Sequence, residues 1–427
     1  MSSVALNFGV SFILLEFNAK PKSTSISSSL AHHKEPIFSH NFVLLALANL
    51  FTFGSFNVLL ATLPIYLKTV GGKESEIGLV LGVFAITALL VRPFVGIAGD
   101  MWGKKKFMII GGIAMAMSPL LYIVSNSVLP MIGVRLFQGL AFGIISTALG
   151  ALIADIVPAS RRGEAVGYFG MSNNIAMAAG PALGIVVMQS WGFTNLFFVS
   201  ASIGLLSVIF SLPVNEPARQ PRPTSVTRPP LVVRSALLPA SVLFCYALTF
   251  GSVVTFLPLF AVTRGLSNPG LFFTVQALVV LALRSFTGRL SDRIGRKTVA
   301  LPGLMFCTIS LILISQVSST TMFLVAAALY ALAFSCIQPP MTAMVIDRVK
   351  PEIRGAAMGT FISAMDAGIG GGAFLWGVVA GLTGYSRMYL IASLVPVLAI
   401  VLFLCVSRVK KKEATSQTQL SGSSEYN

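Results

Sequence analysis

The sequence carries one charged loop twice, and each copy follows an apolar stretch long enough to cross a membrane. The copies lie 192 residues apart, and they share Arg92, Gly96, Asp100, Gly103 and Lys105 with Arg284, Gly288, Asp292, Gly295 and Lys297. The same offset carries Asp155, Arg162, Gly167 and Gly180 onto Asp347, Arg354, Gly359 and Gly372. A period near half the length of an apolar chain predicts two related helical bundles around a central pathway.

The composition indicates a membrane protein. Of its 427 residues, 55% are hydrophobic and 10% are charged, which leaves too little polar surface for a soluble globule. Apolar stretches of ~20 residues, the length that crosses a ~30 Å hydrocarbon core as a helix, can be placed twelve times. They lie at about 41–67, 76–99, 106–125, 129–153, 164–188, 192–212, 236–261, 270–289, 298–316, 321–346, 355–383 and 386–407. We therefore expect an all-α membrane protein of 12 transmembrane helices in two homologous six-helix bundles.

A polar segment separates the two bundles. Residues 213–230 are rich in proline and arginine, a composition that disfavours a helix interior. The expected organisation is a cytoplasmic tail, a bundle, a cytoplasmic linker, a second bundle and a cytoplasmic tail, at 1–40, 41–212, 213–234, 235–407 and 408–427. An even number of spans before the linker gives both bundles one orientation.

The net charge of +16 follows the two sides of the membrane. With the N-terminus inside, 23 of the 30 Lys and Arg residues fall in inside loops and tails and four fall outside. The four are Lys68, Lys73, Arg264 and Arg387. This distribution predicts cytoplasmic termini in an inner or plasma membrane, with lipid as a partner, and it argues against nucleic-acid binding.

Other classes of protein find little support. The four cysteines stand singly in apolar runs without metal or redox spacing, and the three histidines lie in or beside the first tail, so we expect no metal, no cofactor and no enzyme site. No G-x-x-x-x-G-K-[ST] loop for ATP occurs. A receptor would normally add a soluble domain, whereas the tails and linker are short. The apolar segment 4–17 lacks a basic start and a cleavage site, so it is not expected to be a signal peptide.

The doubled loop identifies a family resemblance. The first copy ends its helix with Gly96, Asp100, Gly103, Lys104 and Lys105, and the second with Gly288, Asp292, Gly295, Arg296 and Lys297. Both resemble the G-x-x-x-D-[RK]-x-G-[RK]-[RK] loop of the major facilitator superfamily, although Met101 replaces a basic residue in the first. Physically, the glycines suit a tight reversal and the basic residues anchor the inside face.

The resemblance implies a gating role for the aspartates. A carboxylate at a helix C-terminus opposes the dipole of its own helix, so it should find an external partner. By analogy, Asp100 would meet the start of the helix near Arg354 and Gly355, and Asp292 the start near Arg162 and Gly163. Those contacts would latch the outward-facing state. A loop that sets topology without gating is the alternative.

Two further elements resemble this family. Arg135, Gln138 and Gly139 match its R-x-x-Q-G element, which implicates Arg135 in proton relay, while snorkelling toward the outer surface is the alternative. Gly180, Pro181 and Gly184 partly match a G-x-x-x-G-P-x-x-G-G element associated with exporters, although Ala176 and Ile185 replace glycines. Proline bends a transmembrane helix and glycine admits a close neighbour.

One acidic residue stands deep in a span. Asp366 lies ~16 Å along its helix, near the bilayer midplane, and its repeat partner is Asn174. An intramembrane carboxylate is a candidate for proton coupling or for binding a cationic group, and a structural ion pair or a buried neutral acid is the alternative. Weaker pathway candidates are amides and aromatics within spans: Asn49, Asn57, Asn173, Gln276, Gln338, Phe53, Phe56, Tyr246, Phe250 and Phe256.

The resemblance, over residues 41–407, implies a monomeric secondary transporter that exports small drug-like or metabolite molecules by alternating access, coupled to protons. A proton-coupled importer of a sugar, organic acid or similar metabolite is the alternative.

Overall fold

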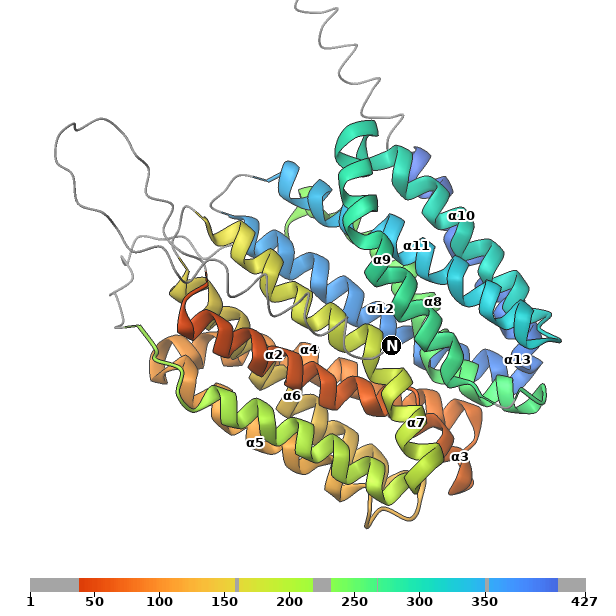
Figure 1. The fold of residues 1–427 in the computed structure, drawn as a ribbon, viewed down its shortest axis with the longest axis horizontal. Coiled ribbons are helices and arrows are strands. Elements are labelled where there is room, and N and C mark those ends of the chain that lie inside the picture. Colours follow the sequence, from red (N-terminus) through yellow and green to blue (C-terminus); the bar gives the residue numbers. More distant parts are fainter. Residues whose placement is uncertain (1–37, 158–160, 218–231, 267, 350–352, 406–427) are drawn as a thin grey trace, which may run out of the picture. The chain divides into compact units, whose positions relative to one another are not determined.

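The computed structural model describes residues 38–157, 161–217, 232–266, 268–349 and 353–405. Within these ranges every regular element is a helix (Figure 1). The two predicted tails and most of the predicted linker lie outside the described residues, so those boundaries stay predictions.

Helices of the first half run from α2 to α7. Their bounds are α2 His40–Leu60, α3 Leu63–Thr69, α4 Glu74–Trp102, α5 Lys104–Leu121, α6 Val128–Ile156 and α7 Arg162–Ser211. Those of the second half are α8 Leu237–Thr263, α9 Gly270–Ile294, α10 Arg296–Ser315, α11 Thr320–Asp347, α12 Arg354–Thr383 and α13 Tyr385–Ala392, after which a helix resumes over 394–405. Figure 1 shows α2 to α7 grouped apart from α8 to α13.

The described helices supply the expected twelve spans. Nine are long and apolar enough to cross a membrane, and α9 makes a tenth when the two parts on either side of its 47° bend are taken together. One of the nine lies within α7, which holds two spans because Gly192 leaves the helical conformation, with φ 80°. The remaining span is α5, whose first turn carries Lys104, Lys105 and Lys106.

The first span, His40–Thr69, agrees with its predicted extent but contains a break. A single helix was expected over 41–67, but α2 ends at Leu60 and α3 begins at Leu63. Pro64 stands in the first turn of α3, where its missing N–H costs no helical hydrogen bond. The same ring cannot continue the preceding helix, so the chain breaks before it.

Small residues hold each half together, and the contacts repeat. A Cβ atom at Gly180 of α7, the repeat equivalent of Gly372, would lie 2.5 Å from the Cβ atom of Asn57 on α2. In the second half, a Cβ atom at Gly372 of α12 would overlap the carbonyl oxygen of Leu248 on α8. Lipid offers no hydrophobic drive between helices, so close backbone packing of this kind supplies the association.

The halves meet along two pairs of helices, α4 with α12 and α7 with α9. These pairs correspond to each other under the 192-residue repeat, because α4 is equivalent to α9 and α7 to α12. The predicted pathway residues lie on or beside these helices.

Candidate functional site

An ion pair joins the two halves deep in the helices. Nη1 of Arg92 on α4 lies 2.6 Å from Oδ2 of Asp366 on α12, and the side chains are 20% and 28% exposed. Among the described residues, Oδ2 accepts no hydrogen bond of ordinary geometry, so the contact is ionic. The sequence predicted both residues as functional, but it assigned Arg92 to the loop motif and gave Asp366 no partner.

Close packing of α4 on α12 extends from this pair to the end of α4 that carries Glu74. The Cβ position of Gly78 overlaps the carbonyl oxygen of Ala373, and that of Gly377 lies 2.7 Å from the carbonyl oxygen of Glu74. In the other direction the glycines of α4 and α12 have free space beside them, because a Cβ atom at Gly96 or at Gly359 would meet nothing within 4 Å. We call the first region the Glu74 end and the second, where the doubled loops lie, the loop end.

A polar cluster also joins the halves at the Glu74 end. Oε1 of Glu74 accepts a hydrogen bond from Nζ of Lys68 at 2.6 Å and from the hydroxyl of Tyr385 on α13 at 3.0 Å. The ring of Tyr385 packs against Phe256 and Phe260 of α8. Sequence analysis missed this cluster, because charged residues at the ends of spans are common.

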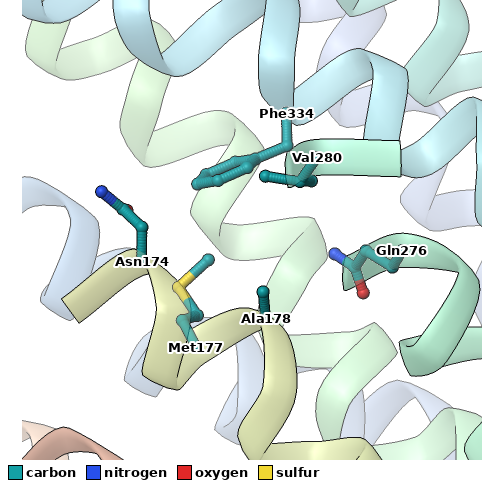
Figure 2. Close-up of a pocket in the computed structure, with 6 residues that line it drawn as sticks. All are labelled: Asn174, Met177, Ala178, Gln276, Val280 and Phe334. Atoms are coloured by element: carbon teal, nitrogen blue, oxygen red, sulfur yellow. The ribbon is translucent and has the colours of Figure 1, made fainter. Parts of the chain in front are cut away.

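The second pair of helices holds a pocket. Its lining is Asn174, Met177 and Ala178 of α7, Gln276 and Val280 of α9, and Phe334 of α11. Figure 2 shows the amides of Asn174 and Gln276 on opposite sides of the pocket. The volume is about 10 Å³, room for roughly one water molecule.

Towards the loop end, glycines of α7 and α9 also have free space beside them. Glycines at 167, 170 and 288 face open space, whereas at the other end the Cβ position of Gly270 lies 3.0 Å from Ile185. In both contacts, the glycines that pack closely against the other half lie toward the Glu74 end.

Arg284 lies one helical turn from the pocket. It follows Val280 by four residues on α9, and its Nη2 donates to Oε1 of Gln338 at 3.1 Å. Gln338 in turn follows Phe334 by four residues on α11. The predicted pathway residue Gln338 therefore contacts a cation next to the pocket.

Arg135 lies inside the first half, where its residue is 0% exposed. Its Nη1 donates to Oε1 of Gln138 at 2.8 Å, and Tyr122 donates to the same oxygen at 3.0 Å. The guanidinium also lies 5.2 Å from the ring centroid of Phe84. Nε and Nη2 have no partner among the described residues. A side chain buried in this way does not snorkel to the surface.

The doubled loops form the same triad twice. Lys104 contacts Asp100 at 3.5 Å and Asp155 at 2.5 Å. At the equivalent positions Arg296 contacts Asp292 and, at 3.3 Å, Asp347. The first triad links α4 and α5 to the end of α6, and the second links α9 and α10 to the end of α11.

Gly103 and Gly295 confirm the predicted reversals, with φ values of 102° and 98° that suit glycine. The predicted contacts of Asp100 and Asp292 with the other half involve Gly355, Arg162 and Gly163, whose side chains lie outside the described set. Those contacts stay predictions, as do the roles of Lys105, Lys297 and the exposed Arg354.

The export-type element of α7 has a packing role in the fold. Gly180 and Gly184 contact α2, and Pro181 is buried between them. The predicted pathway residue Asn57 lies in this contact, because the Cβ position of Gly180 is 2.5 Å from the Cβ atom of Asn57. The Asn57 amide donates to the carbonyl oxygen of Phe53 on its own helix at 2.8 Å.

Comparison with known proteins identifies the family. The model of the Major Facilitator Superfamily matches residues 45–283 and 267–424. The chain belongs to this superfamily and is a multi-pass membrane transporter of the 12-helix type.

Individual relatives agree with this assignment. The chain is similar to the staphylopine export protein of Staphylococcus aureus, with 27% identity over 384 residues that cover 85% of this chain and 95% of the relative. A match to the quinolone resistance protein NorA of the same species is 28% identical over 155 residues, or 36% of this chain and 40% of NorA. A bacterial homologue of the human lysosomal transporter Spinster, solved in an inward-facing and unoccupied conformation, shares the fold. Its TM-score is 0.71 at 15% identity, over 88% of this chain and 98% of that one.

Proposed function

We propose that the protein exports small organic molecules in exchange for protons, with Asp366 as the proton-coupling carboxylate. The observation that carries the proposal is the ion pair of Arg92 with Asp366, which joins the two halves deep in the helices. Protonation of Asp366 would remove its charge and with it the attraction between α4 and α12. A proton could therefore change the balance between two arrangements of the halves.

Alternating access accounts for the unequal packing of the two ends. The structure is closed at the Glu74 end and open beside the glycines of the loop end. We assign the loop end to the cytoplasm, because the basic residues of the loops gather there. In this assignment the described conformation faces inward, and both termini are cytoplasmic in an inner or plasma membrane.

The pocket has to enlarge before it can hold an organic molecule, since it now has room for roughly one water molecule. Rocking of one half against the other would do this, because the pocket lies between α7 of one half and α9 and α11 of the other. Asn174 and Gln338 would then contact the substrate, while Arg135 with Gln138 would support proton relay from within the first half.

The direction of transport is proposed on two grounds. The first ground is the names of two relatives. The relative whose length is matched over 95% is named an export protein, and NorA is named a quinolone resistance protein. The second ground is the resemblance of Gly180, Pro181 and Gly184 on α7 to an element associated with exporters. Import of a metabolite in the direction of the protons is the competing function.

Proteoliposomes of known orientation can separate the two directions. A pH gradient is imposed, and movement of two probes, fluorescein and rhodamine 6G, is followed by fluorescence. We expect at least one probe to move against the inward direction of the protons. Movement of the probes together with the protons would establish an importer and contradict the proposal.

A further inference from the structure

The 192-residue repeat exposes a difference between the two contacts of the halves. Asp366 on α12 corresponds to Asn174 on α7, and Arg92 on α4 corresponds to Arg284 on α9. The first contact therefore holds an arginine and a carboxylate, and the second holds an arginine and an amide. The second arginine lacks the negative charge that its counterpart has.

Arg284 finds no replacement for that charge in the described part of the chain. It donates to the neutral amide of Gln338, and among the described residues no carboxylate forms an ion pair with it. A guanidinium deep in a membrane-spanning helix is costly unless it is paired. The deep parts of the described spans contain three arginines, Arg92, Arg135 and Arg284, but one carboxylate, Asp366. Asp366 pairs with Arg92.

The space beside Arg284 is open where the equivalent space is filled. The pocket residues Gln276 and Phe334 correspond to Phe84 and Phe142, which stack in an aromatic cluster with ring centroids 5.3 Å apart. On that filled side the backbone of Gly370 packs against Ala85, whereas its counterpart Ala178 lines the pocket. The pocket therefore occurs at the contact that lacks the carboxylate.

We propose that the transported molecule is an organic anion, whose carboxylate or similarly charged group binds Arg284. Gln276 lines the pocket and can supply a further hydrogen bond, while Asn174 lies on the opposite side, where its amide donates to the carbonyl oxygen of Gly170 at 2.7 Å (Figure 2). Met177, Val280 and Phe334 would pack against the apolar part of the same molecule. The inference rests on the proposed function, and it adds the class of substrate.

Binding of two dyes with one xanthene core and opposite charges tests this directly. Fluorescein carries a carboxylate and is anionic, and rhodamine 6G is cationic. Each is titrated against the purified full-length chain in detergent, with fluorescence anisotropy as the readout and empty micelles as the background. We expect fluorescein to bind above background and rhodamine 6G to bind more weakly.

Two substitutions locate the site. Arg284→Gln removes the charge, and Asn174→Asp supplies the missing carboxylate within the protein. The first substitution removes the cation that binds the anion, and the second gives Arg284 a carboxylate of the protein in place of the ligand. Each should weaken fluorescein binding on the order of tenfold or more, which is the size of effect that loss of a buried charge pair has. Arg284→Lys keeps the charge and should lose less. Asn195→Asp is the matched control, since Asn195 is exposed and far along the chain from the pocket.

The result is independent of transport direction and of proton coupling, because binding in detergent needs neither. Binding of rhodamine 6G but not fluorescein, or unchanged fluorescein binding by correctly folded Arg284→Gln, would overturn the anionic class and leave the exporter proposal intact. Size-exclusion profiles establish folding, and Arg284→Lys provides a second variant with the same charge as the natural residue.

Discussion

Arg92 and Asp366 meet at 2.6 Å across the boundary between the two halves, from positions whose repeat equivalents are Arg284 and Asn174. The two repeat-related contacts thus differ, since one holds an ion pair and the other holds an arginine and an amide. The side with the ion pair is closely packed toward the Glu74 end, and the other contains the pocket. This asymmetry connects the proposed coupling of protons to the proposed binding of substrate.

Exchanging the two charges tests the ion pair. Arg92→Asp or Asp366→Arg alone should lower stability on the order of 1–3 kcal/mol, between the ranges of exposed and buried pairs, because each leaves two like charges in contact. The double variant should recover part of that loss. Thermal unfolding of the purified protein gives all four values. Purely additive losses in the double variant would mean that the two residues do not interact.

The glycine of the exporter-like element is expected to be intolerant of a side chain. Gly184→Ala places a Cβ atom on the carbonyl oxygen of Val58, so the chain should lose on the order of 1–3 kcal/mol by overpacking. Gly150→Ala is the control, because a Cβ atom there meets nothing within 4 Å. Equal melting temperatures for the two variants would show that α2 and α7 are not packed as described.

Glu74→Gln should weaken the closed Glu74 end. The carboxylate accepts hydrogen bonds from Lys68 and Tyr385. Partly exposed pairs of this kind contribute about 0.2–1 kcal/mol, so the population of molecules open at the Glu74 end should rise by up to about fivefold. Spin labels on Ser75→Cys and Leu382→Cys, with Cys405 replaced by Ser, report the separation of the two halves. Glu76→Gln is the control, since Glu76 accepts from the Lys73 N–H within its own half. An equal effect of both substitutions would argue against a specific closure by Glu74.

Arg135→Lys should reduce proton-driven transport at least about tenfold. Lysine cannot reproduce the planar contact with Phe84 together with the hydrogen bond to Gln138. Transport is measured in proteoliposomes at equal protein density, with Arg387→Lys at an exposed position as the control. Full activity of Arg135→Lys would indicate that any cation suffices there.

The fold could be predicted from the sequence because the hydropathy pattern and the internal repeat each extend over many residues. Twelve apolar stretches and a fixed repeat leave little freedom in helix number or order, and the described helices agree with both. The break between α2 and α3 was missed although Pro64 marks it, because hydropathy does not change there. The spans predicted at about 164–188 and 192–212 are separated in the structure by a break at Gly192, the first residue of the second predicted span.

Single residues of the site were predicted more easily than their partners. Asp366 stood out because an acid within a span is rare, and Arg135 because it matches a motif. The pairing of Arg92 with Asp366 depends on how two antiparallel helices are aligned, which no local pattern specifies. The repeat could have indicated it, since both residues are deep in helices that the repeat relates to α9 and α7.

Helix packing also explains why the surroundings of Asn57, Glu74 and Tyr385 were not predicted. Asn57 was predicted to line the pathway because it is polar, but packing against Gly180 buries it. Tyr385 and Glu74 lie 311 residues apart, and each is ordinary in its own sequence context. The packing of one helix on another decides such contacts.

The most direct test of the account is proton flux measured together with substrate flux, in the wild type and in Asp366→Asn. Proteoliposomes contain pyranine as an internal pH indicator, and the dye that binds the protein serves as the probe. We predict that the wild type moves protons opposite to the probe, and that Asp366→Asn moves the probe only down its own gradient, without proton flux. Proton flux at the wild-type rate in Asp366→Asn would contradict the proposal that Asp366 couples protons to export.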